Sequence, residues 1–302
     1  MTLTIQVKQL IEDKGFTQAQ IAKECGFSGG ALSSYFKGTY KGDNEKLETA
    51  LQKWLDGQTQ KTATFVSAPD FVDTPTASKI FADFDFVKMF GKMGVIYGAS
   101  GVGKTQAARQ YTKANNNVWM ITARPSICTI NEVLYEMALE LGISDAPKRA
   151  GKLSRMLKIK LAGTRGLMII DEADHLPLKV LEELRILQED SEVGFMLIGN
   201  DKVYTQMQGG FNQRHEFARL WSRNAKRQSV QKNSKKDIDA VATAWGLELT
   251  DSKLMTALYS IGQGAGSLRA LTNYLQLAGL QARARNEPIT LALILSAQQQ
   301  MG

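Results

Sequence analysis

Cysteine and histidine are scarce in this sequence of 302 residues, which contains two of each. The two cysteines, Cys25 and Cys128, lie among apolar residues, so we expect buried free thiols, and two cysteines are too few for a zinc site. No apolar run approaches the roughly 18 residues that a membrane-spanning helix needs, and the N-terminus lacks the apolar core of a signal peptide. These absences predict a cytoplasmic protein without a membrane partner.

Positive charge is what the sequence has in excess, since 37 lysines and arginines stand against 30 acidic residues and the formal net charge is +7. Such a balance suggests a polyanionic partner. The apolar content of 43% is ordinary for a globular protein, and the length allows two or three domains. Where the charge gathers is more informative than its total.

A glycine-rich stretch, GASGVGKT at residues 98–105, follows a short apolar run and precedes a segment that can form a helix. In this context GxxxxGK followed by Ser or Thr forms a phosphate-binding P-loop; the alternative is a glycine-rich turn with a surface lysine. Backbone N–H groups and the helix N-terminus would surround a phosphate chain. Lys104 would reach the β- and γ-phosphates, and the Thr105 hydroxyl would ligate Mg²⁺, so we predict ATP and Mg²⁺ as ligands. The predicted ATP contacts are Gly98, Ser100, Gly101, Val102, Gly103, Lys104 and Thr105.

Two acidic residues follow the apolar run 167–170, which is the Walker B pattern when it stands downstream of a P-loop. Asp171 is predicted to bind ATP through Mg²⁺, and Glu172 to polarise the attacking water as general base. Asn200 follows another apolar run, 194–199, and in a parallel sheet it would lie beside these carboxylates and orient the water. The alternative for Asn200 is a turn-forming role within Gly-Asn-Asp.

Apolar and amphipathic segments alternate from residue 79 to 229, which predicts an α/β core with an open, mostly parallel sheet between helices. The order of its motifs favours the AAA+ class of P-loop NTPase over simple kinases. Residues 230–302 are predicted to form the helical lid of that class, and Arg269, near the start of its third helix, would contact the γ-phosphate as sensor 2. The predicted lid helices are 237–245, 253–261, 267–285 and 291–300.

One basic segment, residues 146–165, holds seven basic residues and no acid, on an amphipathic helix and the loop before it. This arrangement suits a contact with duplex phosphates that is independent of sequence. The alternative is a solvated basic helix face. The predicted DNA contacts are Lys148, Arg149, Lys152 and Arg155.

A second basic segment, residues 214–236, holds eight basic residues and one acid. In a AAA+ ring or filament an arginine here enters the ATP site of a neighbouring copy and stabilises transition-state charge. Arg223 is the first candidate for this catalytic role and Arg219 the second, and a solvated basic helix is again the alternative.

Two short helical segments near the N-terminus meet at Gly26, with the small Ala22 four residues earlier, as two helices crossing at a tight turn require. The pattern resembles the helix-turn-helix of phage repressors, in which the second helix, here about 29–37, contacts DNA; Ser33 and Lys37 are the predicted contacts. Residues 1–56 carry seven lysines and seven acids. We therefore expect weak or auxiliary DNA binding, and a protein contact is the alternative.

An amphipathic helix at 44–55 closes this N-terminal module. The next stretch, residues 57–78, combines polar and small residues with two prolines and no period, which is typical of a linker. We therefore predict a helix-turn-helix domain at 1–56, a linker at 57–78, the ATPase core at 79–229 and the lid at 230–302.

Longer strings in this chain resemble those of one family, the B transposition proteins of Mu-like phages. They are a GxxGVGKT P-loop, NNNVWMIT at 115–122, IIDEADH at 169–175, LEELRILQE at 181–189 and EFARLWSRNAKR from residue 216. The resemblance implies a AAA+ ATPase that assembles into a helical filament or ring on double-stranded DNA with little sequence preference. It also implies slow, DNA-stimulated hydrolysis in a bacterial host cell, disassembly after hydrolysis, and delivery of target DNA to a partner transposase, which it stimulates.

Two other functions compete with this one. A helicase-loader-like AAA+ protein would prefer a helicase partner and often single-stranded DNA. A DNA-binding regulator would use its helix-turn-helix as the main contact and nucleotide only as a conformational switch. Intact Lys104, Asp171 and Glu172 argue against the regulator, because a switch alone does not need the residues of hydrolysis.

Overall fold

The computed structural model describes residues 3–14, 16–64, 69–208 and 224–301. The chain divides into two compact units, residues 1–67 with 279–288 and residues 68–278 with 289–302. None of the helices in the described ranges combines the length and apolar character needed to cross a membrane.

In its described residues between 3 and 64, the N-terminal unit contains four helices, α1 (Leu3–Lys14), α2 (Gln18–Glu24), α3 (Gly29–Phe36) and α4 (Asn44–Thr64). The predicted helix pair is present as α2 and α3, and the turn between them contains Gly26 at a φ of +76°. Thr17 and Ser28 cap the two helices by accepting backbone N–H hydrogen bonds, which explains where each begins. Use of α3 in DNA binding stays a prediction. The buried core of the unit consists of Val7, Ile21, Ala22, Leu32, Leu47, Leu51, Trp54 and Leu55.

The stretch predicted to be a linker, residues 57–78, is helical at both of its ends. Helix α4 continues to Thr64, and α5 (Pro75–Phe90) begins at Pro75. The start of α5 has a local cause, because the Thr74 side chain accepts a hydrogen bond from the Ala77 N–H and Pro75 stands in the first turn, where its missing N–H costs nothing. Composition alone does not show this start signal.

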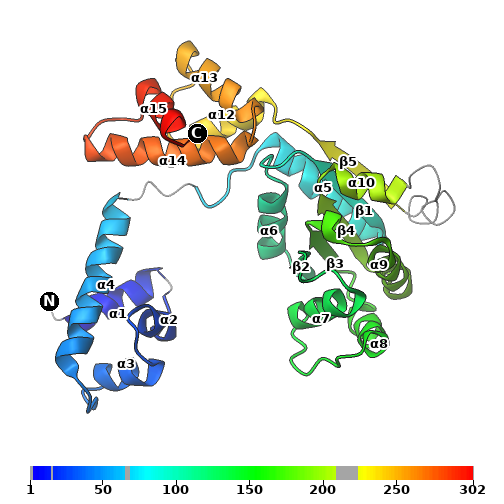
Figure 1. The fold of residues 1–302 in the computed structure, drawn as a ribbon, viewed down its shortest axis with the longest axis horizontal. Coiled ribbons are helices and arrows are strands. Elements are labelled where there is room, and N and C mark those ends of the chain that lie inside the picture. Colours follow the sequence, from blue (N-terminus) through cyan, green and yellow to red (C-terminus); the bar gives the residue numbers. More distant parts are fainter. Residues whose placement is uncertain (1–2, 15, 65–68, 209–223, 302) are drawn as a thin grey trace. The chain divides into compact units, whose positions relative to one another are not determined.

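The second unit is built on a five-stranded sheet with the order β2-β3-β4-β1-β5 (Figure 1). Its strands are β1 (Met93–Gly98), β2 (Val118–Thr122), β3 (Leu167–Asp171), β4 (Gly194–Gly199) and β5 (Asn224–Val230). All adjacent pairs are parallel. The central strands β3 and β4 are buried along their whole length, and for this reason they appear in the sequence as continuous apolar runs.

Helices cover both faces of this sheet, as the sequence predicts. On one face α5 and α6 (Lys104–Ala114) pack on side chains such as Ile96, Ile169 and Ile198. On the other face α7 (Ile130–Glu140), α8 (Ala150–Leu161) and α9 (Leu178–Ser191) pack on side chains that include Val95, Ile170 and Leu197. The short helix α10 (Asp201–Gln208) follows β4, and a 3-10 turn, η1 (Ala173–His175), follows β3.

The C-terminal helices match their predicted bounds to within two residues. They are α12 (Lys235–Ala244), α13 (Ser252–Gln263), α14 (Ser267–Ala284) and α15 (Leu291–Met301). Strand β5, in contrast, is not predicted from the sequence. Its residues, NAKRQSV, form an edge strand whose side chains alternate between exposed and partly buried. They belong to a basic run and lack the apolar character of a central strand.

Candidate functional site

A pocket of about 820 Å³ lies at the carboxyl ends of the strands, where open α/β sheets bind ligands. Its size is typical of small-molecule and cofactor sites. All seven predicted P-loop contacts line it, together with Asp171, Glu172, Asn200 and Arg269. The structure therefore brings together, around one cavity, residues that are as far apart in the chain as Gly98 and Arg269.

The P-loop backbone has the conformation that its glycines permit. Gly98, Gly101 and Gly103 have φ values of +133°, +82° and +101°, which side chains disfavour. Gly103 is also the N-cap of α6 and offers no side chain to cap it. The N–H groups of the first turn of α6 are thus available to an anion, and the helix dipole favours one there.

The Lys104 ammonium folds back over the P-loop. Its Nζ donates hydrogen bonds to the carbonyl oxygens of Gly98 at 2.9 Å and Ala99 at 2.7 Å. Burial lowers the pKa of Lys104, while the nearby carboxylates of Asp171 and Glu172 act in the opposite direction. A cation held in this way at the mouth of the loop suits a polyphosphate ligand.

The Walker B carboxylates stand at the tip of β3. Asp171 is 2% exposed and accepts a hydrogen bond from the Thr105 hydroxyl. Burial raises the pKa of Asp171, and this hydrogen bond opposes the shift. Glu172 follows with a φ of +53°, an uncommon conformation for a residue with a side chain, which turns the chain sharply after the strand.

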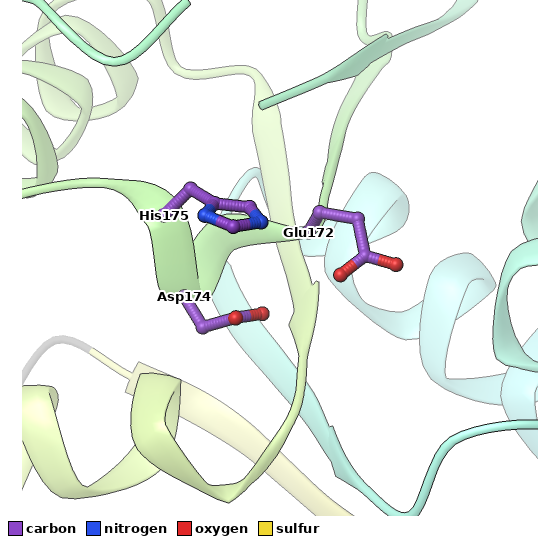
Figure 2. Close-up of side chains that lie close together, drawn as sticks. All are labelled: Glu172, Asp174 and His175. Atoms are coloured by element: carbon purple, nitrogen blue, oxygen red, sulfur yellow. The ribbon is translucent and has the colours of Figure 1, made fainter. Parts of the chain in front are cut away.

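Three side chains after the end of β3 lie close together, as Figure 2 shows: Glu172, Asp174 and His175. Burial raises the pKa of Glu172 and the charges of Asp171 and Asp174 raise it further, whereas His175 lowers it. A carboxylate with a raised pKa accepts a proton more readily, which suits a general base. Asp174 and His175 were not predicted as site residues, although both belong to the string IIDEADH.

Asn200 lies at the tip of β4, next to the tip of β3, as predicted. Its side-chain Nδ2 donates a hydrogen bond to Asp174 Oδ2 at 2.8 Å, and its backbone N–H donates to Asp174 Oδ1 at 3.3 Å. Asn200 Oδ1 accepts a hydrogen bond from the Lys202 N–H at 2.8 Å, so Lys202 and the buried Asp174 together fix the orientation of the Asn200 amide. The predicted neighbour of Asn200 was the Walker B pair, whereas its hydrogen-bond partner is this second carboxylate.

Arg269 connects the C-terminal helices to the P-loop. Its backbone N–H donates to the Gly101 carbonyl at 3.2 Å, and its guanidinium Nη1 donates to Ser100 Oγ at 3.3 Å. The arginine stands on the wall of the pocket, beside the loop that would hold the phosphates. Contact of Arg269 with the γ-phosphate, the sensor 2 role, stays a prediction.

The predicted DNA contacts lie in both units. Lys148 and Arg149 precede α8, Lys152 and Arg155 belong to it, and all four are exposed. In the N-terminal unit Lys37 is exposed and Ser33 is partly exposed on α3. Arg219 and Arg223 lie outside the described residues.

Comparison with known proteins gives matches along most of the chain. The model for the Mu B transposition protein, C terminal, matches residues 222–301, and a AAA domain model matches residues 89–207. The Mu-like prophage FluMu DNA transposition protein B of Haemophilus influenzae is 50% identical over 90% of this chain and 94% of its own. The chain belongs to the Mu B transposition protein family. The ATP-dependent target DNA activator B of Escherichia phage Mu, a further relative, is 45% identical over 94% of this chain and 89% of its own.

Solved structures support the fold of this family member. The ORC2 protein of Aeropyrum pernix has a TM-score of 0.54 and 16% identity, with 74% of this chain and 66% of that chain covered. Cdc6p of Pyrobaculum aerophilum has a TM-score of 0.56 and 13% identity, with 80% and 70% covered. Together with the AAA match and the strand order, they confirm the predicted AAA+ core. The chain is thus a AAA+ ATPase of the Mu B transposition protein family.

Proposed function

We propose that this ATPase activates target DNA for transposition: it binds duplex DNA when ATP is bound and delivers that DNA to a partner transposase. One observation carries the proposal. The P-loop, both Walker B carboxylates and the lid arginine line one pocket, in a chain that is 45% identical to a phage protein named ATP-dependent target DNA activator B. The helicase-loader and regulator alternatives have no comparable support.

The pocket suits Mg²⁺ with ATP. The Thr105 hydroxyl and the Asp171 carboxylate are hydrogen-bonded to each other, and such hard oxygen donors are the ligands that Mg²⁺ takes. Mg²⁺, when bound, would neutralise charge on the β- and γ-phosphates. Lys104 would turn from the loop carbonyls to these phosphates, and Arg269 would contact the γ-phosphate.

Hydrolysis requires an oriented water and a base. Glu172 would accept the proton of the water as its oxygen attacks the γ-phosphorus and the bond to the β–γ bridging oxygen breaks. Asn200 would orient that water, with its amide held by Asp174. A neighbouring copy would complete the site with Arg223 or Arg219, so hydrolysis depends on assembly into a filament or ring on DNA.

The DNA contact that we propose is the exposed basic surface formed by Lys148, Arg149, Lys152 and Arg155. These side chains would contact phosphates, which carry no sequence information, so the protein would bind many targets alike. Ser33 and Lys37 of the N-terminal unit would add a weaker contact. The protein would act in the cytoplasm of the bacterial host, where both the DNA and the transposase are present.

The test is the substitution Glu172→Gln, which keeps the shape of the side chain and removes the base. We expect ATP binding to persist, the hydrolysis rate to fall by at least about 100-fold, and ATP-dependent filaments on duplex DNA to last longer than those of the native protein. An ATPase assay measures the hydrolysis rate, and electron microscopy measures how long the filaments last. Glu140→Gln, on an exposed residue at the end of α7, is the control.

Two results would contradict the proposal. One is the absence of ATP-dependent duplex binding by the Glu172→Gln protein. The other is a clear preference for single-stranded DNA, which would favour the helicase-loader function instead.

A further inference from the structure

A buried carboxylate behind the nucleotide pocket joins two helices that come from distant parts of the chain. Asp237, in the first turn of α12, is 0% exposed. Its Oδ1 accepts a hydrogen bond from the Thr76 N–H at 2.8 Å, and its Oδ2 accepts one from the Thr76 hydroxyl at 2.9 Å. The N–H and the hydroxyl of Ser234 also donate to Oδ2, each at 2.7 Å.

This single side chain caps the N-termini of two helices. Ser234 and Asp237 form the capping box of α12. The Thr76 N–H belongs to the first turn of α5, where N–H groups have no partner within the helix. Both helix dipoles favour a negative charge at this point. Burial raises the pKa of Asp237, but the hydrogen bonds from Ser234 and Thr76 outweigh it and leave that pKa below its usual value.

The two helices that Asp237 joins carry two walls of the pocket. Phe71, Val72 and Thr74 line it just before α5, and Ala77 lines it from the first turn of that helix. Val241 lines it from α12, one turn after Asp237, and Trp245 follows at the end of the same helix. These walls are largely apolar, unlike the P-loop side of the pocket, so they suit the base of a nucleotide rather than its phosphates.

A neighbouring buried residue connects the same junction to the P-loop. Asn233 is 1% exposed, and its Nδ2 donates to the Val102 carbonyl at 3.2 Å. Gln263 of α13 donates to the Asn233 carbonyl at 3.4 Å. The segment 233–237 thus holds the start of α5, the lid and the P-loop in one arrangement, without itself lining the pocket.

We propose that Asp237 is a positioning residue for the nucleotide, which fixes the apolar walls of α5 and α12 at the spacing that the base requires. The proposal rests on the ATP site described above, and it separates the part of that site that binds the base from the part that binds the phosphates. Affinity for the base and ribose depends on Asp237. Affinity for the polyphosphate depends on the P-loop and is independent of Asp237.

The experiment compares two ligands in the full-length protein with Mg²⁺: ATP, and inorganic tripolyphosphate, which has no base. Dissociation constants come from displacement of a fluorescent ATP analogue. In Asp237→Asn, an amide NH₂ faces donors that now lack an acceptor. A lost hydrogen bond to a charged group changes the equilibrium between the native and a loosened arrangement of the walls by about tenfold or more. We expect the Kd for ATP to rise about tenfold, the Kd for tripolyphosphate to change by less than about twofold, and kcat at saturating ATP to stay near that of the native protein.

The matched control is Asp239→Asn. Asp239 lies on the same helix and accepts a hydrogen bond from the Tyr259 hydroxyl of α13 at 2.7 Å, so this change removes the charge from a lid contact that does not reach α5. Both dissociation constants should stay unchanged in the control. A second variant, Thr76→Val, removes only the hydroxyl donor, and we expect a smaller loss of ATP affinity with tripolyphosphate binding intact.

Equal weakening of both ligands by Asp237→Asn would overturn the proposal, because it would show general damage to the fold. Unchanged ATP binding would overturn it as well. If Asp237→Asn does not fold, Thr76→Val is the test instead. A ratio of the Kd for ATP to the Kd for tripolyphosphate that equals the ratio of the native protein then refutes the proposal. Failure of the native protein to bind either ligand would instead refute the ATP site itself.

Discussion

Gly101 stands where the P-loop meets the lid. Its φ is +82°, and a Cβ at this position would lie 2.1 Å from the carbonyl oxygen of Gly266, just before α14. The Arg269 N–H donates to the Gly101 carbonyl from the same side. A side chain here would therefore separate the lid from the loop, and Arg269 would move away from the phosphates.

We expect Gly101→Ala to raise the Kd for ATP at least about tenfold, because the clash removes lid contacts as well as straining the loop. Gly163→Ala is the matched control, since Gly163 has a φ of +75° and open space around its Cβ position. Gly163→Ala should cost about 1 kcal/mol of stability through backbone strain. Gly101→Ala should cost more, because the clash with Gly266 is added to the same strain. Equal ATP affinity in the two variants, measured by calorimetry, would show that the lid contact is unimportant.

Capping boxes mark the starts of helices in both the core and the lid. Thr129 and Glu132 form a capping box at α7, and Ser234 and Asp237 form one at α12. The second box differs from the first, because its carboxylate also receives donors from α5. The stability of the junction between core and lid should therefore respond to the charge of Asp237.

The sign of this response follows from the pKa of Asp237, which folding lowers below its ordinary value of 3.8. A carboxylate with a lowered pKa in the folded state stabilises that state fully above its ordinary pKa, and the stabilisation is lost as the pH falls through the folded value. We expect Asp237→Asn to unfold at a lower temperature than the native protein at pH 7. The difference should shrink below about pH 4.

Thermal unfolding followed by circular dichroism between pH 7 and pH 3 measures this difference. Asp239→Asn again serves as control. A gap between Asp237→Asn and the native protein that stays constant down to pH 3 would show that folding does not lower the pKa of Asp237.

The whole molecule carries an excess of seven positive charges, and the proposed use of this charge depends on where it lies. Lys148, Arg149 and Lys152 gather at the start of α8, on one face of the sheet. Lys79, Lys92 and Lys113 are exposed as well, on or beside the helices of the opposite face. The two sets contribute equally to the net charge. Only the set at the start of α8 belongs to the surface that we propose to contact DNA phosphates.

We expect neutralisation of Lys148, Arg149 and Lys152 to weaken duplex binding on all sequences alike. The slope of log K against log salt should become shallower by roughly 0.9 for each lost phosphate contact. Neutralising Lys79, Lys92 and Lys113 removes the same charge and should leave the slope nearly unchanged. Titrations with two unrelated duplexes at several salt concentrations give both slopes; equal effects of the two triple variants would mean that only net charge matters.

Much of the ATP site can be predicted from sequence because its motifs are local. The P-loop and the Asp171–Glu172 pair are short strings at strand ends, and buried parallel strands such as β3 appear as apolar runs. The lid helices can be predicted from the spacing of their apolar residues, which matches the helical period. Strand β5 cannot, because an edge strand with alternating polar residues resembles a charged surface segment.

The nucleotide chemistry, the AAA+ class and the family can all be predicted from the sequence, because the motifs that indicate them are short strings of neighbouring residues. The contact of Asp174 with Asn200, and the junction that Asp237 makes between α12 and α5, become visible only in the folded chain. Thr76 and Asp237 are 161 positions apart, so no local pattern pairs them. The physical reason is that a hydrogen bond depends on distance in space, and the packing of helices on the sheet sets that distance.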